Sequence, residues 1–244
     1  MPRFFVAASN IFGGVAYIDS KDAEHLKVLR VKKGEEIVVC DGQGRDHRCR
    51  VTSVDGGSAQ AEIVETTASA GEPDVDCRVY AAYPKGDKAE TIIQKSVELG
   101  AGEIIFFPSE RCVSRPDAAS VAKKLERWNR ISREAAMQSQ RGRVPLVRAV
   151  GSYNEAISEA AGAELPLFLY EGKCKLGLLE AMKGSDGFKS VSLVTGSEGG
   201  FTPEEVEKAE AAGLVCASLG PRILRCETAP LCALSAVMLY SGNL

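Results

Sequence analysis

The sequence predicts an α/β protein in two parts, a small N-terminal β-barrel and a larger domain built on a parallel sheet. In residues 1–70, apolar and polar positions alternate along short runs that are separated by tight turns. From residue 71 onward, apolar runs typical of buried strands alternate with helical patterns, as in βαβ units. The stretch 66–73 between them is small and polar and ends in proline. We therefore predict two domains, 1–70 and 71–244.

The N-terminal domain is expected to be a β-meander that closes as a barrel. An apolar run at 37–40 leads into a turn at 41–44, and the segments 48–52 and 59–64 alternate between apolar and polar residues. One short helix is predicted over 20–30, where it interrupts the meander.

The C-terminal domain is expected to be a parallel sheet whose strands are joined by helices. Thr202 as N-cap, Pro203 at the first helical position and Glu205 in a capping box predict one helix start, and Gly213 predicts its end. The carboxyl ends of parallel strands share one sheet edge, where open α/β sheets bind ligands. The predicted strands cover 78–83, 104–107, 165–169, 191–195 and 214–219; the other predicted helices cover 88–99, 118–140 and 230–240.

The composition of the 244 residues, 45% hydrophobic and 26% charged, is that of a soluble globular protein, for which we expect a cytoplasmic location. No apolar run is long enough to cross a membrane, and the first residues do not read as a signal peptide. Two histidines without ligand spacing predict no metal site. The eight cysteines include no C-x-x-C pair, so we expect buried, reduced thiols, notably at Cys40, Cys77, Cys174, Cys216 and Cys232.

Two glycine-bearing loops each follow a predicted strand of the second domain. The first, 196–200, has neither the Lys-Ser/Thr of a Walker loop nor the spacing of a dinucleotide fingerprint, and alone it could be an ordinary strand-to-helix turn. The second, 220–229, carries Ile223 and Leu224 between two arginines. We predict that this apolar pair is buried while the arginines reach polar partners. With a third loop at 170–172, these segments could enclose an adenosine-sized ligand.

Together the first two loops resemble the cofactor loops of the knotted SPOUT-class RNA methyltransferases. Within that class they are most similar to the enzymes that methylate N3 of a uridine in small-subunit (16S) ribosomal RNA. Ser197 stands where that family usually has proline and Cys226 where it usually has threonine, but both side chains are small. The segment 25–30 followed by Gly34 resembles the PUA-like RNA-binding barrel of the same enzymes. The resemblance therefore covers both halves of the chain.

The resemblance implies a PUA-like barrel at 1–70 and, at 71–244, a SPOUT methyltransferase domain with a C-terminal trefoil knot. It implies S-adenosylmethionine as methyl donor, ribosomal RNA or the small ribosomal subunit as partner, and a homodimer. No metal is required, because the sulfonium methyl is already activated. The residues that the resemblance assigns to the cofactor are Leu169, Tyr170, Glu171, Thr195, Gly196, Glu198, Gly199, Gly200, Leu219, Gly220, Ile223, Leu224, Arg225, Glu227, Thr228 and Ala229.

Methyl transfer to uridine N3 must deal with an imide proton that is mostly retained at neutral pH. The site needs a base, or groups that stabilise the anion as it develops. We predict that Arg222 is the catalytic residue that stabilises this charge. Glu227 is predicted to pair with an arginine, which would lower its pKa and make it a weak base. The proton acceptor and the target nucleotide stay open.

The net charge of −3 gives no global support for nucleic-acid binding, but basic residues crowd the segment 111–148. There, Arg141 and Arg143 flank Gly142 without a visible acidic partner. They could compensate the dipole of the preceding helix or clamp an RNA phosphate, and the resemblance favours the clamp. The residues predicted to bind RNA are Arg30, Lys85, Arg111, Arg133, Gln138, Arg141 and Arg143.

Two other functions stay open. A knotted enzyme that methylates a ribose 2′-hydroxyl of transfer or ribosomal RNA would have similar cofactor loops. A PUA-like RNA-binding assembly factor could have lost catalysis, although the intact loop glycines and arginines argue against such a loss.

Overall fold

The computed structural model describes residues 1–19, 31–55, 58–172, 174–185 and 187–244. The helix predicted over 20–30 lies outside this part of the chain. Two compact units are present, Met1–Glu72 with Ala136–Val144, and Pro73–Ala135 with Pro145–Leu244. The predicted boundary, between 70 and 71, assigned 136–144 to the second domain, whereas this segment packs with the first unit.

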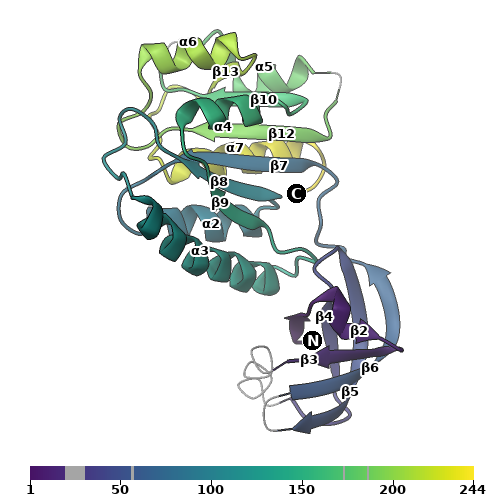
Figure 1. The fold of residues 1–244 in the computed structure, drawn as a ribbon. Helices are drawn as coiled ribbons and strands as arrows, with labels where there is room; N and C mark the ends of the chain where they lie inside the picture. The colour runs from purple at the N-terminus through teal and green to yellow at the C-terminus, as the bar shows by residue number, and fades with distance from the viewer. Residues whose placement is uncertain (20–30, 56–57, 173, 186) are drawn as a thin grey trace. The chain divides into compact units, whose positions relative to one another are not determined.

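In the first unit, six strands form one curled sheet in the order β1-β4-β5-β6-β3-β2 (Figure 1). Neighbouring strands are antiparallel, except that β1 runs parallel to β4. Alternate side chains point inward, so Phe4, Ile37, Val39 and Val51 are almost fully buried in its core. The elements are β1 Arg3–Phe5, the 3-10 turn η1 Ala8–Asn10, β2 Ile11–Phe12, β3 Val15–Ile18, β4 Glu36–Cys40, β5 Arg45–Asp55 and β6 Ser58–Ala68.

In the second unit, seven strands form a sheet in the order β11-β13-β10-β12-β7-β8-β9, and every neighbouring pair is parallel. The central strands are covered on both faces, which explains why they read as continuous apolar runs; Val79, Ile104 and Leu193 are fully buried. This confirms the predicted α/β class. The strands are β7 Asp76–Ala82, β8 Glu103–Phe107, β9 Leu146–Ala149, β10 Leu165–Leu169, β11 Leu176–Gly177, β12 Ser190–Thr195 and β13 Val215–Ser218.

The helix Pro203–Ala211 begins and ends where its capping residues predict. The Thr202 hydroxyl accepts a hydrogen bond from the Glu205 N–H at 3.2 Å, and the Glu205 carboxylate accepts one from the Thr202 N–H at 2.9 Å. Gly213 follows that helix with a φ of +95°, as a left-handed cap requires. The helices are α2 Lys88–Glu98, α3 Ala118–Gln138, α4 Tyr153–Ala160, α5 Leu178–Lys183, α6 Pro203–Ala211 and α7 Thr228–Tyr240.

Four of these elements, β9, α4, β11 and α5, were not anticipated from the sequence. Helix α4 packs against β7, β8 and β12, and the last helix, α7, packs against β7, β12 and α2. Figure 1 shows α4 in front of the sheet and α7 (yellow) behind it. After β13 the chain thus returns to the middle of the sheet, a course that the predicted knot requires.

The sheet register brings the candidate loops to one edge. Phe168 pairs with Val194 and Leu169 pairs with Ala217, so β10, β12 and β13 end nearly level with one another. The loops that follow these three strands therefore leave the sheet together at its carboxyl edge.

Candidate functional site

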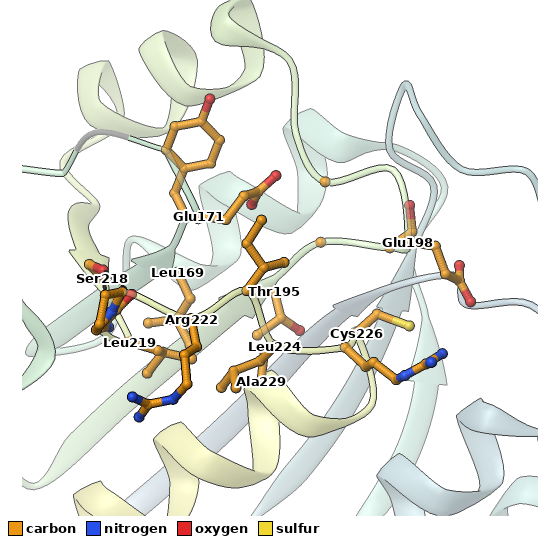
Figure 2. A pocket seen from close by; sticks show the side chains of 18 of the residues that line it. Leu169, Glu171, Thr195, Glu198, Ser218, Leu219, Arg222, Leu224, Cys226 and Ala229 are labelled. Carbon is orange, nitrogen blue, oxygen red and sulfur yellow. Dashed lines mark hydrogen bonds between the residues drawn. The ribbon is translucent and has the colours of Figure 1, made fainter.

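The loops after β10, β12 and β13 enclose a pocket of about 330 Å³, a volume that suits a small organic ligand (Figure 2). Arg222, the predicted catalytic residue, lines it. Of the residues predicted to bind the cofactor, Gly199, Glu227 and Thr228 are not in the wall. Those that line the pocket are Leu169, Tyr170, Glu171, Thr195, Gly196, Glu198, Gly200, Leu219, Gly220, Ile223, Leu224, Arg225 and Ala229.

The pocket wall also contains residues that the sequence did not assign to it: Lys88, Ser197, Ser218, Pro221 and Cys226. Lys88 is the first residue of α2, and it follows the loop at the end of β7. That strand ends at the same sheet edge, beside β12. A predicted strand followed directly by a Pro-Lys-Gly-Asp turn was the signal that could have placed Lys88 here.

The glycine turn after β12 contributes Gly196, Ser197, Glu198 and Gly200 to the pocket wall. The Gly200 N–H donates to the carbonyl of Ser197 at 3.0 Å, and Gly200 has a φ of +64°. A Cβ at Gly200 would collide with the Glu171 carboxylate, and one at Gly199 would lie 2.8 Å from the Cβ of Arg111. Gly200 therefore needs glycine for its backbone conformation, and Gly199 needs it for space.

The hydroxyl of Ser197 is buried and has no hydrogen-bond partner among the described residues. A buried, unsatisfied hydroxyl costs free energy until a ligand or a water completes its hydrogen bonding. The same pocket offers the apolar side chains of Leu169 and Leu224. The wall thus fits a ligand that combines an apolar face with polar atoms, as an adenosine does.

A small charge cluster lies at one end of the pocket, where Lys88 sits between two carboxylates. Its Nζ is 2.8 Å from Glu198 Oε1 and 3.3 Å from Glu227 Oε2. Its hydrogen bond to Glu198 raises the pKa of Lys88. Partial burial opposes ionisation of Glu198, but bonds from Lys88 and from backbone N–H groups lower its pKa to about 2. Burial also opposes ionisation of Glu227, but hydrogen bonds from the backbone, from Cys226 and from Lys88 lower its pKa.

Two predictions about the second loop are wrong. Ile223 is 82% exposed rather than buried. Leu224 is half-buried in the pocket wall, whereas Ile223 lines the same pocket and stays open to solvent. Glu227 pairs with Lys88 and not with an arginine. Arg222 and Arg225 are both exposed, and neither forms an ion pair within the described residues.

The structure also contradicts the prediction of a phosphate clamp at Arg141. Its guanidinium is buried and donates two hydrogen bonds of 2.9 Å to the Glu72 carboxylate, from Nε and from Nη2. The Arg141 carbonyl accepts a further bond from Arg3 at 3.1 Å. A buried guanidinium whose Nε–Nη2 edge is paired with a carboxylate in this way is a structural element of the first unit.

The other predicted RNA contacts stay predictions. Arg133 is half-buried on α3, and Arg30 lies outside the described residues. The Arg111 side chain donates to the Gly199 carbonyl at 3.3 Å while remaining exposed. The exposed members of the set are Lys85, Arg111, Gln138 and Arg143.

The eight cysteines are free thiols. The expectation of burial is wrong for Cys232, which is exposed on α7, because that helix is apolar on all sides and only part of it is covered. The sulfur atoms of Cys174 and Cys216 lie 2.8 Å apart. Within the described residues, no three His, Cys, Asp or Glu side chains gather as a metal site would require, and no helix has the length and apolarity to cross a membrane.

The structure defines a two-domain protein, with a parallel α/β sheet that carries a three-loop pocket at its carboxyl edge and a small β-unit in the same chain. Residues 71–238 match the family model of the RNA methyltransferase domain, and residues 18–64 match that of the RNA methyltransferase PUA domain. The chain therefore belongs to the RNA methyltransferase family. This confirms the resemblance identified in the sequence.

Named relatives align with this chain over nearly its whole length. "Ribosomal RNA small subunit methyltransferase E" of Bacillus subtilis is 38% identical and covers 90% of this chain and 88% of its own length. The protein of the same name from Mycobacterium bovis is 34% identical, with 96% and 90% covered. A crystal structure of the Neisseria gonorrhoeae enzyme of that name, bound to S-adenosylmethionine, superimposes with a TM-score of 0.87 at 34% identity and 98% coverage of both chains.

Proposed function

We propose that this chain methylates N3 of a uridine in small-subunit (16S) ribosomal RNA and uses S-adenosylmethionine as donor. The observation that carries the proposal is the three-loop pocket, in a chain that matches a cofactor-bound relative along its full length. The names of the relatives support the small-subunit RNA as substrate. The choice of uridine N3 rests on the resemblance of the loops 196–200 and 220–229 to the uridine-N3 enzymes.

The pocket residues divide the work of binding. The glycine turn contributes backbone groups, Leu169 and Leu224 contribute apolar contact, and the Ser197 hydroxyl gains the partner that it lacks. When bound, S-adenosylmethionine supplies a sulfonium methyl that needs no metal to activate it. The remaining task of the protein is to align the uracil and to make its N3 nucleophilic.

Arg222 is the residue we assign to the second task. Its guanidinium is exposed at the pocket and has no ion-pair partner within the described residues, so it is available to the negative charge that develops on the uracil. Glu198 and Glu227 are weak bases, because Lys88 and hydrogen bonds lower the pKa of each. Both carboxylates are therefore poorly suited to accept the N3 proton.

The same proposal includes a homodimer that works in the cytoplasm. The second unit exposes apolar side chains at the pocket rim and on α7, including Ile223 at 82%, Leu239 at 69% and Tyr240 at 42%. Apolar surface of this kind is typical of a protein contact, and a second copy would cover it. Sedimentation equilibrium should then report twice the mass of the chain, and a monomer at micromolar concentration would contradict this part of the proposal.

Nucleoside mass spectrometry tests the reaction. Ribosomal RNA from cells that lack the protein is incubated with the purified chain and S-adenosylmethionine with an isotopically labelled methyl group. After digestion, the label should appear in 3-methyluridine from small-subunit RNA. Label in a 2′-O-methylnucleoside would support the ribose enzyme instead, and RNA binding without any label would support an assembly factor.

A further inference from the structure

Lys88 connects the two glycine-bearing loops of the pocket through its ammonium group. The ammonium lies 2.8 Å from Glu198 Oε1, on the loop after β12. It lies 3.3 Å from Glu227 Oε2 and 3.7 Å from Cys226 Sγ, both on the segment that leads into α7. Figure 2 shows Glu198 and Cys226 together at one end of the pocket, away from Arg222.

A third loop joins the same cluster through its backbone. The N–H of Lys85, in the loop after β7, donates to Glu198 Oε1 at 3.1 Å. Glu198 is thus held by a side chain and a backbone group from the β7–α2 connection, while Glu227 depends on Lys88 for its ion pair. The segments that follow β7, β12 and β13 therefore meet in one cluster, which contains the ammonium of Lys88.

In this cluster Lys88 contributes one positive charge against the two negative charges of Glu198 and Glu227. An ammonium has three N–H donors, and here three acceptors surround it, two of which are carboxylates. The side chains of Lys88, Glu198 and Glu227 are only 28%, 26% and 23% exposed, so water screens them in part. If the cation were removed, two like charges on different loops would face each other in this partly buried site.

We infer that Lys88 is a positioning residue of the cofactor site, which holds the loop 196–200 and the loop 219–227 in the spacing that forms the pocket. It acts through Glu198 and Glu227 rather than on the reacting atoms. This inference rests on the proposed function only in taking S-adenosylmethionine as the ligand of the pocket.

The inference has a pH signature. The titratable groups that face Lys88 are Glu198, Cys226 and Glu227. Burial raises the pKa of Cys226 to about 12, so its thiol stays neutral. The pKa of Glu198, about 2, lies below its ordinary value of 4.5, so its pairing with Lys88 is complete above pH 4.5 and is lost only as the pH falls toward 2. Cofactor affinity of the wild type should therefore be independent of these carboxylates from about pH 5 to about pH 8.

The test compares Lys88→Met with the double variant Lys88→Met/Glu227→Gln by isothermal calorimetry with S-adenosylmethionine. At neutral pH, Lys88→Met should raise the Kd roughly 10-fold, the change that accompanies loss of one charged hydrogen bond. The double variant removes the uncompensated charge and should recover most of the affinity. Lowering the pH to about 5 should also restore part of the affinity of Lys88→Met, because protonation relieves the same repulsion.

The matched control is Lys95→Met, which removes a cation from the same helix. Lys95 pairs with Glu98 at 2.8 Å and does not line the pocket. The Kd of Lys95→Met for S-adenosylmethionine should therefore equal that of the wild type. Wild-type affinity in Lys88→Met would overturn the inference. An affinity loss that neither Glu227→Gln nor acid recovers would also overturn it, since loss of packing alone would behave in that way.

Hydrogen exchange without added ligand separates this inference from the proposed function. Amides of 196–200 and 219–227 should exchange faster in Lys88→Met than in the wild type, and the double variant should reverse the change. If the wild type fails to bind S-adenosylmethionine, the proposed function fails, whereas these exchange rates still decide the role of Lys88. Should Lys88→Met not fold, the double variant and Lys88→Arg, which keeps the charge, carry the comparison.

Discussion

Two arginine-bearing loops look alike in the sequence and differ in the structure. In the first unit, Arg141 is buried against Glu72, with two hydrogen bonds of 2.9 Å. In the second unit, Arg222 and Arg225 are exposed at the pocket, with no ion pair in the described part of the chain. One loop uses its guanidinium to hold a fold together. The other leaves its guanidinium groups exposed at the pocket.

The difference teaches that the role of an arginine depends on tertiary partners that local sequence does not contain. Glu72 lies 69 residues before Arg141, and no pattern in the sequence near position 141 predicts this pairing. A buried guanidinium needs such a carboxylate, because an unpaired charge in the interior is too costly. An exposed guanidinium has no such requirement and is free to act on substrate.

The largest expected effect concerns the unpaired arginine of the pocket. Arg222→Ala should lower methyl transfer by roughly 100-fold or more if the guanidinium stabilises developing charge. Arg222→Lys keeps the charge but lacks the planar guanidinium, so its rate should lie between that of the wild type and that of Arg222→Ala. Single-turnover assays measure the rate, and thermal unfolding should be unchanged because the side chain is exposed. A wild-type rate in Arg222→Ala would show that Arg222 does not act on the substrate, and the functional contrast with the structural Arg141 would be wrong.

The next effect is on stability rather than on rate. Arg141→Met leaves the partly buried Glu72 carboxylate without its partner and should destabilise the first unit by about 3 kcal/mol. Urea unfolding followed by hydrogen exchange in β5 and β6 measures the change. Arg222→Ala serves as the control and should unfold like the wild type. Unaltered stability in Arg141→Met would mean that the Glu72 pair does not hold the unit together.

The smallest effect is expected at Arg143, the exposed neighbour of Arg141. Its side chain lies beside Gly44 of the first unit, and it remains available to a phosphate. Arg143→Ala should reduce the slope of log affinity against log salt for RNA by about 1, with cofactor affinity unchanged. If the salt dependence matches that of the wild type, this loop has no contact with RNA.

Much of the fold follows from short-range patterns. The buried strands around Val79 and Leu193 are apolar because both sheet faces are covered. The start of α6 follows from Thr202 and Glu205, which form the predicted capping box. The pocket could likewise be predicted, because parallel strands bring their following loops to one edge and glycine marks the positions of close approach, as at Gly200.

The remaining features depend on contacts between distant segments. Lys88 reaches Glu198 across 110 positions of sequence, and no local pattern encodes that approach. The exposure of Ile223 conflicts with its hydropathy, and only the course of the loop decides that Leu224 is the more buried member of the apolar pair. Helix α4 has a start signal that our prediction from the sequence did not use, since its N-cap Ser152 accepts a hydrogen bond from the Glu155 N–H at 3.1 Å. Strand β9 is only four residues long, and tertiary pairing rather than propensity defines it.

The most direct test of the account is the pH dependence of methyl transfer by Arg222→Ala beside that of the wild type, each with saturating S-adenosylmethionine and RNA. A cation that eases ionisation of the uracil imide matters most when the imide is protonated and least when solution pH has already removed the proton. The rate of the variant should therefore approach that of the wild type as the pH rises toward the pKa of uracil. A deficit that stays constant over that range would contradict the role of Arg222 in stabilising the anion.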